Sequence, residues 1–133
     1  MGPVANGQIF PEIEAAAADI EAALAEARRT GRRVILSFGG DWCPDCQALH
    51  VYFGQSPNAE LLAEHYILVN VNVGMKDANL DVAQRYGVAV TSVPVLAVVD
   101  GEGKVVHAQS KEFSNMREME ALVVTEFLNQ WKP

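Results

Sequence analysis

The run Val34-Ile-Leu-Ser-Phe-Gly-Gly-Asp-Trp-Cys-Pro-Asp-Cys46 joins a short apolar stretch to a Cys-x-x-Cys pair. Residues 34–38 are rich in β-formers and mostly apolar on both faces, which is typical of a buried central strand. The two glycines that follow predict a turn. Residues 43 to about 55 carry apolar side chains four apart, which is a helical spacing. We therefore expect the cysteine pair in the first turn of a helix that directly follows a buried strand.

Cys43 and Cys46 at such a position are suited to disulfide exchange. Unpaired N–H groups and the positive end of the helix dipole stabilise a thiolate at a helix N-terminus. Cys43 is the expected nucleophile, exposed at the turn, and Cys46 is placed one turn inward to resolve the mixed disulfide. Pro44 fits the first helical position. The negative charge of Asp45 disfavours a thiolate at Cys43, which predicts a reductant more than a strong oxidant.

Helical and strand patterns alternate along the rest of the chain. Besides the elements around the cysteines, we expect helices at 11–31, 59–65 and 79–86, and strands at 66–73, 93–99 and 104–108. A final helix is expected to begin near Ser114 or Asn115, and a start at Asn115 would place Glu118 at the capping-box position. Its apolar stripe comprises Met119, Leu122, Val123, Phe127 and Trp131.

Size and charge limit the classes of function. The chain has 133 residues and a formal net charge of −7. We expect a single domain over residues 1–133, with 1–10 as an N-terminal extension, and a monomer. The acidic charge and scattered basic residues argue against nucleic acid and anionic membranes as partners. No apolar run approaches the roughly 20 residues that span a bilayer, so membrane insertion is not expected.

The compartment stays open. The first ten residues lack the basic and apolar regions of a signal peptide. A cytoplasmic protein fits this start, and so does a bacterial periplasmic protein whose signal is absent from this sequence. The two cysteines are too few for a disulfide-stapled scaffold and point to redox or metal chemistry.

A metal site is the alternative use of the cysteine pair. Cys46 and His50, four residues apart, could share a zinc ion on one helical face. A structural zinc site needs four ligands, but His65 and His107 lie singly on other expected elements. Gln47 stands where the haem-attachment pattern requires histidine. We therefore expect no metal, and His50 is expected to be a solvated helix residue.

Three parts of the sequence together resemble the thioredoxin superfamily. Residues 34–46 resemble its active-site strand, turn and helix, and Arg85-Tyr-Gly-Val88 with Thr91-Ser-Val-Pro-Val95 resembles its helix end and cis-proline strand. Extra residues near 54–58 and 74–79 look more like bacterial thioredoxin-like disulfide reductases and isomerases, including the C-terminal domain of DsbD. The resemblance implies an α/β thioredoxin fold, in which helices flank both faces of a central mixed β-sheet.

The resemblance also implies roles for residues outside the cysteine pair. Pro94 would be cis and face the cysteines, and the Val93 backbone would pair with a substrate chain as a strand. An ordinary trans proline at a strand start is the alternative. Trp42 would pack and also offer an apolar lip for substrate. Trp42, Pro44, Asp45 and Pro94 are therefore the expected supporting residues, and Trp42, Val93 and Pro94 the expected substrate contacts.

The chain departs from the family at the position that moves protons. Thioredoxin has a buried aspartate in its active-site strand, and alignment on the cysteines puts Ser37 there. The neighbouring lysine is expected to be replaced by an apolar residue near Leu68. Because a serine hydroxyl stays protonated at neutral pH, proton transfer is expected to use water or Asp45.

The leading hypothesis is a thiol–disulfide oxidoreductase that acts on protein disulfides as a reductase or isomerase. It would need no cofactor beyond its own redox-active disulfide, and an upstream protein would supply its electrons. One alternative is a thioredoxin-like binding module with a structural cysteine pair. Another is a reductase dedicated to one partner, such as a cytochrome-maturation or peroxidase system. The residues do not separate the leading hypothesis from the dedicated reductase.

Overall fold

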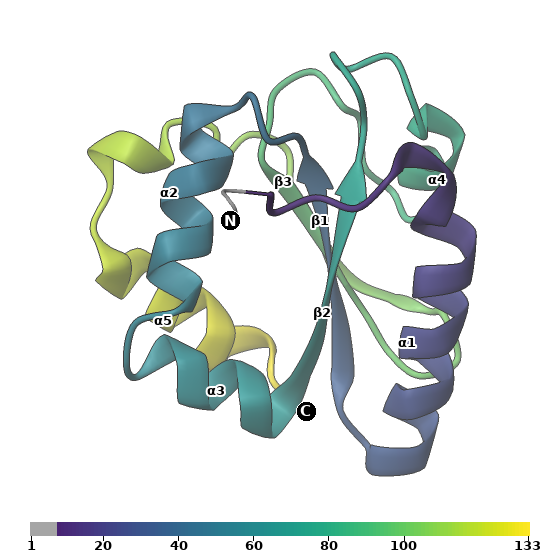
Figure 1. The fold of residues 1–133 in the computed structure, drawn as a ribbon. Coiled ribbons are helices and arrows are strands. Elements are labelled where there is room, and N and C mark those ends of the chain that lie inside the picture. The colour runs from purple at the N-terminus through teal and green to yellow at the C-terminus, as the bar shows by residue number, and fades with distance from the viewer. Residues whose placement is uncertain (1–7) are drawn as a thin grey trace.

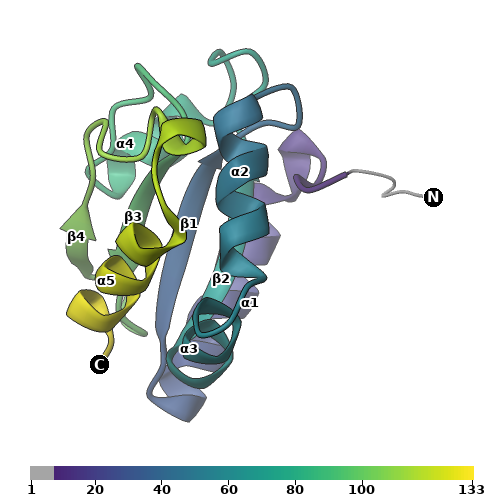
Figure 2. The same cartoon turned by 90° about the vertical axis from the view of Figure 1, so that its left-hand side faces the viewer.

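A four-stranded mixed β-sheet lies at the centre of the computed structural model, which describes residues 8–133 (Figure 1). The elements in order are η1 (Ile13–Ala15), α1 (Ala16–Thr30), β1 (Arg33–Gly39), α2 (Pro44–Phe53), α3 (Asn58–His65), β2 (Tyr66–Asn72), α4 (Leu80–Arg85), β3 (Val95–Val99), β4 (Val105–Ala108), η2 (Met116–Glu118) and α5 (Ala121–Trp131). The strand order is β2-β1-β3-β4, with β1 parallel to β2 and antiparallel to β3. Helices α2, α3 and α5 lie on one side of the sheet and α1 and α4 on the other (Figures 1 and 2). The predicted α/β fold with helices on both faces is therefore confirmed.

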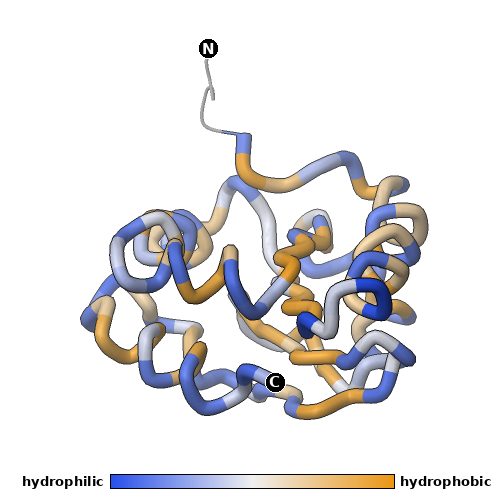
Figure 3. The backbone as a smooth tube through the Cα atoms, turned by 90° about the horizontal axis from the view of Figure 1, so that it is seen from below, coloured by the Kyte–Doolittle hydropathy of each residue, from blue (hydrophilic) through white to orange (hydrophobic). Residues whose placement is uncertain are grey.

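The alternation of side chains along β1 builds two apolar cores. Leu36 and Phe38 belong to the cluster that includes α1, whereas Ile35 belongs to the cluster that includes α2 and α5. Viewed from below, hydrophobic residues gather along the central strands (Figure 3). Each large apolar side chain that is fully buried stabilises the fold by about 1.5–3 kcal/mol. The carboxyl end of β1, where the cysteine motif begins, is thus held firmly from both sides.

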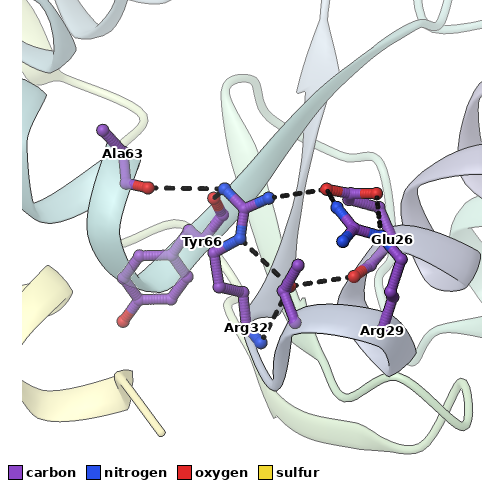
Figure 4. Close-up of polar contacts among 6 residues, drawn as sticks. Glu26, Arg29, Arg32, Ala63 and Tyr66 are labelled. Carbon is purple, nitrogen blue, oxygen red and sulfur yellow. Dashed lines mark hydrogen bonds and ion pairs between the residues drawn. The ribbon is translucent and has the colours of Figure 1, made fainter.

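Polar contacts hold the turn between α1 and β1, which lies at the opposite end of β1 from the cysteine motif (Figure 4). Gly31 ends α1 in the left-handed conformation, at a φ of 77°. The Arg32 guanidinium then donates to the carbonyl oxygens of Ala63 and Tyr66, both at 3.3 Å, and pairs with Glu26 at 3.1 Å. These contacts connect α1 to the junction of α3 and β2, which supports the parallel pairing of β1 with β2.

The prediction for the last helix was wrong at its start. The chain makes a 3-10 turn over η2, adopts extended backbone at Met119 and Glu120, and begins α5 only at Ala121. Asn115 makes no side-chain capping bond. Tertiary contacts override the local signal, since the Met119 carbonyl accepts a hydrogen bond from Tyr52 of α2. Leu122, expected on the buried stripe, is 61% exposed, because the buried face of α5 carries Val124, Phe127 and Leu128 and Leu122 lies about 200° around the helix from Val124.

The N-terminal segment is part of the fold where the structure describes it. Residues 1–7 of the expected extension lie outside the described residues, but the segment from Gln8 crosses the sheet before η1 (Figure 1). Phe10 is buried within the core that also contains Cys46. The side chain of Asn72 on β2 donates to the Pro11 carbonyl at 3.0 Å. Residues 9 and 10 of the expected extension therefore pack against the rest of the domain.

Within residues 8–133, no helix combines the length and the apolar character that a bilayer span requires.

Candidate functional site

The cysteine pair lies at the start of α2, as predicted. Cys43 is the N-cap residue, and its Sγ accepts a hydrogen bond from the backbone N–H of Cys46 at 3.1 Å. Pro44 occupies the first position of the helix, where the missing N–H costs nothing. The helix N-terminus thus presents a donor directly to the Cys43 sulfur. This arrangement stabilises negative charge on that sulfur.

Cys43 is not exposed at the turn, which corrects the prediction. The residue is only 3% exposed. Its thiol turns inward and donates to the Val93 carbonyl at 3.6 Å, besides accepting from the helix. Both cysteines are free thiols in the structure, so this is the geometry of the reduced pair.

Cys46 is as buried as Cys43, and its thiol resists ionisation. Burial is the main cause that raises the pKa of its thiol, followed by its hydrogen bond with Cys43, while a hydrogen bond from the Gly40 backbone acts in the opposite direction. The charge of Asp45 is a smaller raising cause. Cys46 therefore stays protonated until it resolves a mixed disulfide, as its expected role requires.

Asp45 is held by a residue far along the chain. Its Oδ1 accepts from the backbone N–H of Arg117 at 2.9 Å and from the Arg117 Nε at 3.1 Å. The aspartate is only 9% exposed. Two donors from η2 thus hold this carboxylate oxygen.

Trp42 forms an exposed lip beside the pair. Its side chain is 42% exposed, and its Nε1 donates to the Gly74 carbonyl at 2.7 Å. Gly74 has a φ of 60°, which favours glycine there. The bond fixes the indole against the loop at 73–79, where Met75 is also exposed. The exposed indole thus borders the site in a fixed position.

The segment before β3 faces the cysteines. The Val93–Pro94 peptide bond is cis. Val93 and Pro94 precede β3, which begins at Val95 and not at Val93 as expected. Among residues 8–133, Val93 makes no backbone–backbone hydrogen bond.

The surroundings of Ser37 differ from the prediction in one respect. Ser37 is buried on β1, but its partner across the parallel pairing is the polar Asn70, because Leu68 pairs with Ile35. Ser37, Asn70 and Cys46 line a cavity of about 10 Å³. This is roughly the space that one water molecule needs.

In the part of the chain from residue 8 onward, no three side chains among His, Cys, Asp and Glu come together in a group that could hold a metal ion. His50 is exposed on α2, as expected for a solvated residue.

Three supporting residues were missed from the sequence. Arg117 binds Asp45. The Asp41 carboxylate accepts hydrogen bonds from the backbone N–H groups of Ile9 and Phe10, at 2.8 and 3.0 Å. Phe10 thereby lies close to Cys46: a Cβ added at Gly39 would be 2.9 Å from its Cζ and 2.6 Å from the cysteine Sγ. The glycines at 39 and 40 could have indicated close packing around the cysteines. The aspartates at 41 and 45 could have indicated hydrogen-bond donors from distant segments.

Comparisons with known proteins agree with this geometry. The crystal structure of a disulphide isomerase from Xylella fastidiosa Temecula1 superposes with a TM-score of 0.83, at 32% identity, over 92% of this chain and 96% of that one. The C-terminal domain of DsbD from Neisseria meningitidis shares the fold, with a TM-score of 0.55 at 20% identity over 83% of this chain and 97% of that one.

Sequence comparison gives the same relationship. The thiol:disulfide interchange protein DsbD of Escherichia coli K12 is 30% identical over 86 residues, which are 65% of this chain but only 15% of DsbD. A thioredoxin-like family model matches residues 15–101, which include both cysteines. With more than half of its length matched, the chain belongs to the thioredoxin-like family, among its disulfide oxidoreductases.

Proposed function

We propose that this protein exchanges disulfides with protein substrates, in the reducing or isomerising direction, through the Cys43–Cys46 couple. The observation that carries the proposal is the hydrogen bond from the Cys46 N–H to the Cys43 sulfur at the start of α2. A dithiol whose outer sulfur accepts from a helix N-terminus is suited to nucleophilic attack on a disulfide.

The reaction proceeds in two exchanges. The Cys43 thiolate attacks one sulfur of a substrate disulfide, the substrate S–S bond breaks, and the released substrate thiolate takes up a proton. Cys46 then loses its proton and attacks the Cys43 sulfur, which forms the intramolecular disulfide and releases the second substrate thiol. Two electrons pass to the substrate, and an upstream donor protein returns them. In isomerisation, the released substrate thiolate instead attacks another substrate disulfide. The thiolate freed by that attack then attacks the substrate sulfur bound to Cys43, so a new substrate disulfide forms and Cys43 leaves as a thiolate without net oxidation.

Substrate recognition falls to the rim of the site. The Val93 backbone lies beside the Cys43 sulfur, which would bring a pairing chain next to the nucleophile. Pro94 follows it in the cis conformation. The exposed indole of Trp42 offers an apolar surface to side chains near the substrate disulfide. These features support an extended protein segment as substrate.

Water is the best candidate to move the proton of Cys46. The cavity beside Ser37 borders the thiol, whereas Asp45 does not line this cavity and one of its carboxylate oxygens is held by Arg117. Ser37 and Asn70 can orient a water without ionising. Of the two proton-transfer routes expected from the sequence, water is therefore preferred over Asp45.

Trapping the mixed disulfide tests the function. In Cys46→Ser the resolving step is lost, so incubation of the reduced variant with insulin should accumulate a covalent adduct at Cys43 that dithiothreitol releases. Cys43→Ser is the control and should form far less adduct. Equal adduct formation by both variants, or none by either, would refute the proposed nucleophile.

The equilibrium reduction potential separates the two directions. Protein that is first equilibrated in glutathione buffers and then alkylated would show by mass the fraction of oxidised pair. A value at or below about −230 mV supports a reductase, and one near or above about −180 mV supports an isomerase or oxidant. A pair that forms no disulfide at any buffer ratio would contradict redox function.

A further inference from the structure

The contact between Asp45 and Arg117 joins the cysteine motif to a segment 72 residues away. One carboxylate oxygen receives both the backbone N–H and the guanidinium Nε of Arg117. The acid is nearly buried, while 62% of the arginine side chain is exposed. A carboxylate with little access to water requires such donors to remain charged.

The placement of Arg117 does not depend on its own side chain alone. Met116, which precedes it, is fully buried in the core with α2 and α5. Met119 is the C-cap residue of η2, and its carbonyl oxygen accepts a hydrogen bond from the Tyr52 hydroxyl at 2.8 Å. The residues before and after Arg117 therefore both contact the side of the protein that contains α2. These contacts hold the Arg117 guanidinium beside Asp45.

The charge of Asp45 acts on the thiols next to it. Its carboxylate raises the pKa of Cys46, after burial and the hydrogen bond to Cys43. Cys43 lies two residues before Asp45 and accepts a hydrogen bond from the Cys46 N–H at its sulfur. Arg117 brings a compensating positive charge from η2. Asp41, the other carboxylate of the motif, is engaged by the amides of Ile9 and Phe10.

We propose that Arg117 is a positioning residue of the redox site: it fixes the Asp45 carboxylate against η2 and offsets its charge beside the two cysteines. The proposal rests on the proposed function, since it concerns the reactivity of Cys43. Without the guanidinium, the carboxylate keeps one backbone donor but loses its counter-charge, and forming a thiolate at Cys43 requires a higher pH.

The test is the pH profile of Cys43 alkylation by iodoacetamide in the reduced full-length chain, with the modified residue identified by mass spectrometry. Arg117→Gln should move the midpoint up by roughly half a unit, which is about a threefold loss of rate at a fixed lower pH. Asp45→Asn should move it down. Arg117→Gln should move the midpoint less in the Asp45→Asn background than in the original protein, because the carboxylate that Arg117 positions is then uncharged. Lys104→Gln removes the same charge from the β3–β4 turn and should leave the profile unchanged.

Each outcome has a distinct meaning. If Arg117→Gln leaves the midpoint in place, or shifts it equally with and without Asp45, the positioning role is refuted even though Cys43 reacts normally. Arg117→Lys keeps the charge and should return most of the shift, whereas a purely structural role would not distinguish it from glutamine. If Cys43 of the unaltered protein is not alkylated at any pH, the proposed function and this inference both fail.

Discussion

Adding one methyl group at Gly39 should disturb the resolving cysteine. Gly39 ends β1, and a Cβ there would lie 2.6 Å from the Cys46 Sγ and 2.9 Å from the Phe10 Cζ. Ordinary contacts between such atoms are about 3.5–4.0 Å, so the neighbours must move by roughly 1 Å. Both neighbours are buried, and overpacking of this kind costs about 1–3 kcal/mol. We expect Gly39→Ala to lower the free energy of unfolding of the reduced protein by that amount.

Urea denaturation followed by circular dichroism measures the change, and the trapping experiment gives a second readout. A sulfur displaced by about 1 Å should resolve the mixed disulfide much more slowly, by up to roughly 100-fold. Gly54→Ala is the matched control: its Cβ would come no closer than 3.5 Å to other atoms, so its stability should stay within about 0.5 kcal/mol of the original. If Gly39→Ala behaves like Gly54→Ala in both assays, the packing argument is wrong.

Three further substitutions test other contacts. Phe10→Ala should let iodoacetamide reach Cys46 faster in the folded reduced protein, and unchanged labelling in peptide maps would show that the aromatic ring does not shield it. Burial raises the pKa of Tyr66, so the unfolded chain loses this proton first and the tyrosine's contribution to stability is lost as the pH rises above about 10. Tyr66→Phe lacks the hydrogen bond to the Leu128 carbonyl, so its free energy of unfolding at pH 7 should be lower by about 1 kcal/mol. In urea titrations, the free energy of unfolding of this variant should fall less steeply with rising alkaline pH than that of the original protein. An identical slope for both proteins would contradict this. Asn58→Ala should lower the free energy of unfolding by about 1–3 kcal/mol, because Asn58 bridges α3 to α5 from a buried position, and a melting temperature equal to the original would refute that bridge.

The sequence predicts those features of the site that follow from local order. A buried strand, two glycines and a cysteine before proline place the Cys43 sulfur at a helix N-terminus without knowledge of any distant residue. The structure has this arrangement, with Cys43 as N-cap and Pro44 next. Strand periodicity likewise separates the two cores, because alternate residues of β1 face opposite layers.

Features that depend on tertiary contacts could not be predicted in this way. Cys43 looks exposed in a turn until the Val93 carbonyl, fifty residues away, is brought beside it. Asn70 faces Ser37 only once the register between β1 and β2 is known. The capping pattern near Asn115 is a normal helix start, but burial of Met116 and the Tyr52–Met119 bond outweigh it.

The residues between and before the cysteines explain why the motif is more than a pair of thiols. Asp41 binds the N-terminal segment, Trp42 binds the loop at 73–79, and Asp45 binds η2. Each side chain thus fastens a different distant segment to the start of α2. Since these segments surround the two sulfurs, a substitution in the motif changes the walls of the site as well as its local charge. The reactivity of this pair therefore depends on contacts that a four-residue motif, compared between proteins in isolation, does not contain.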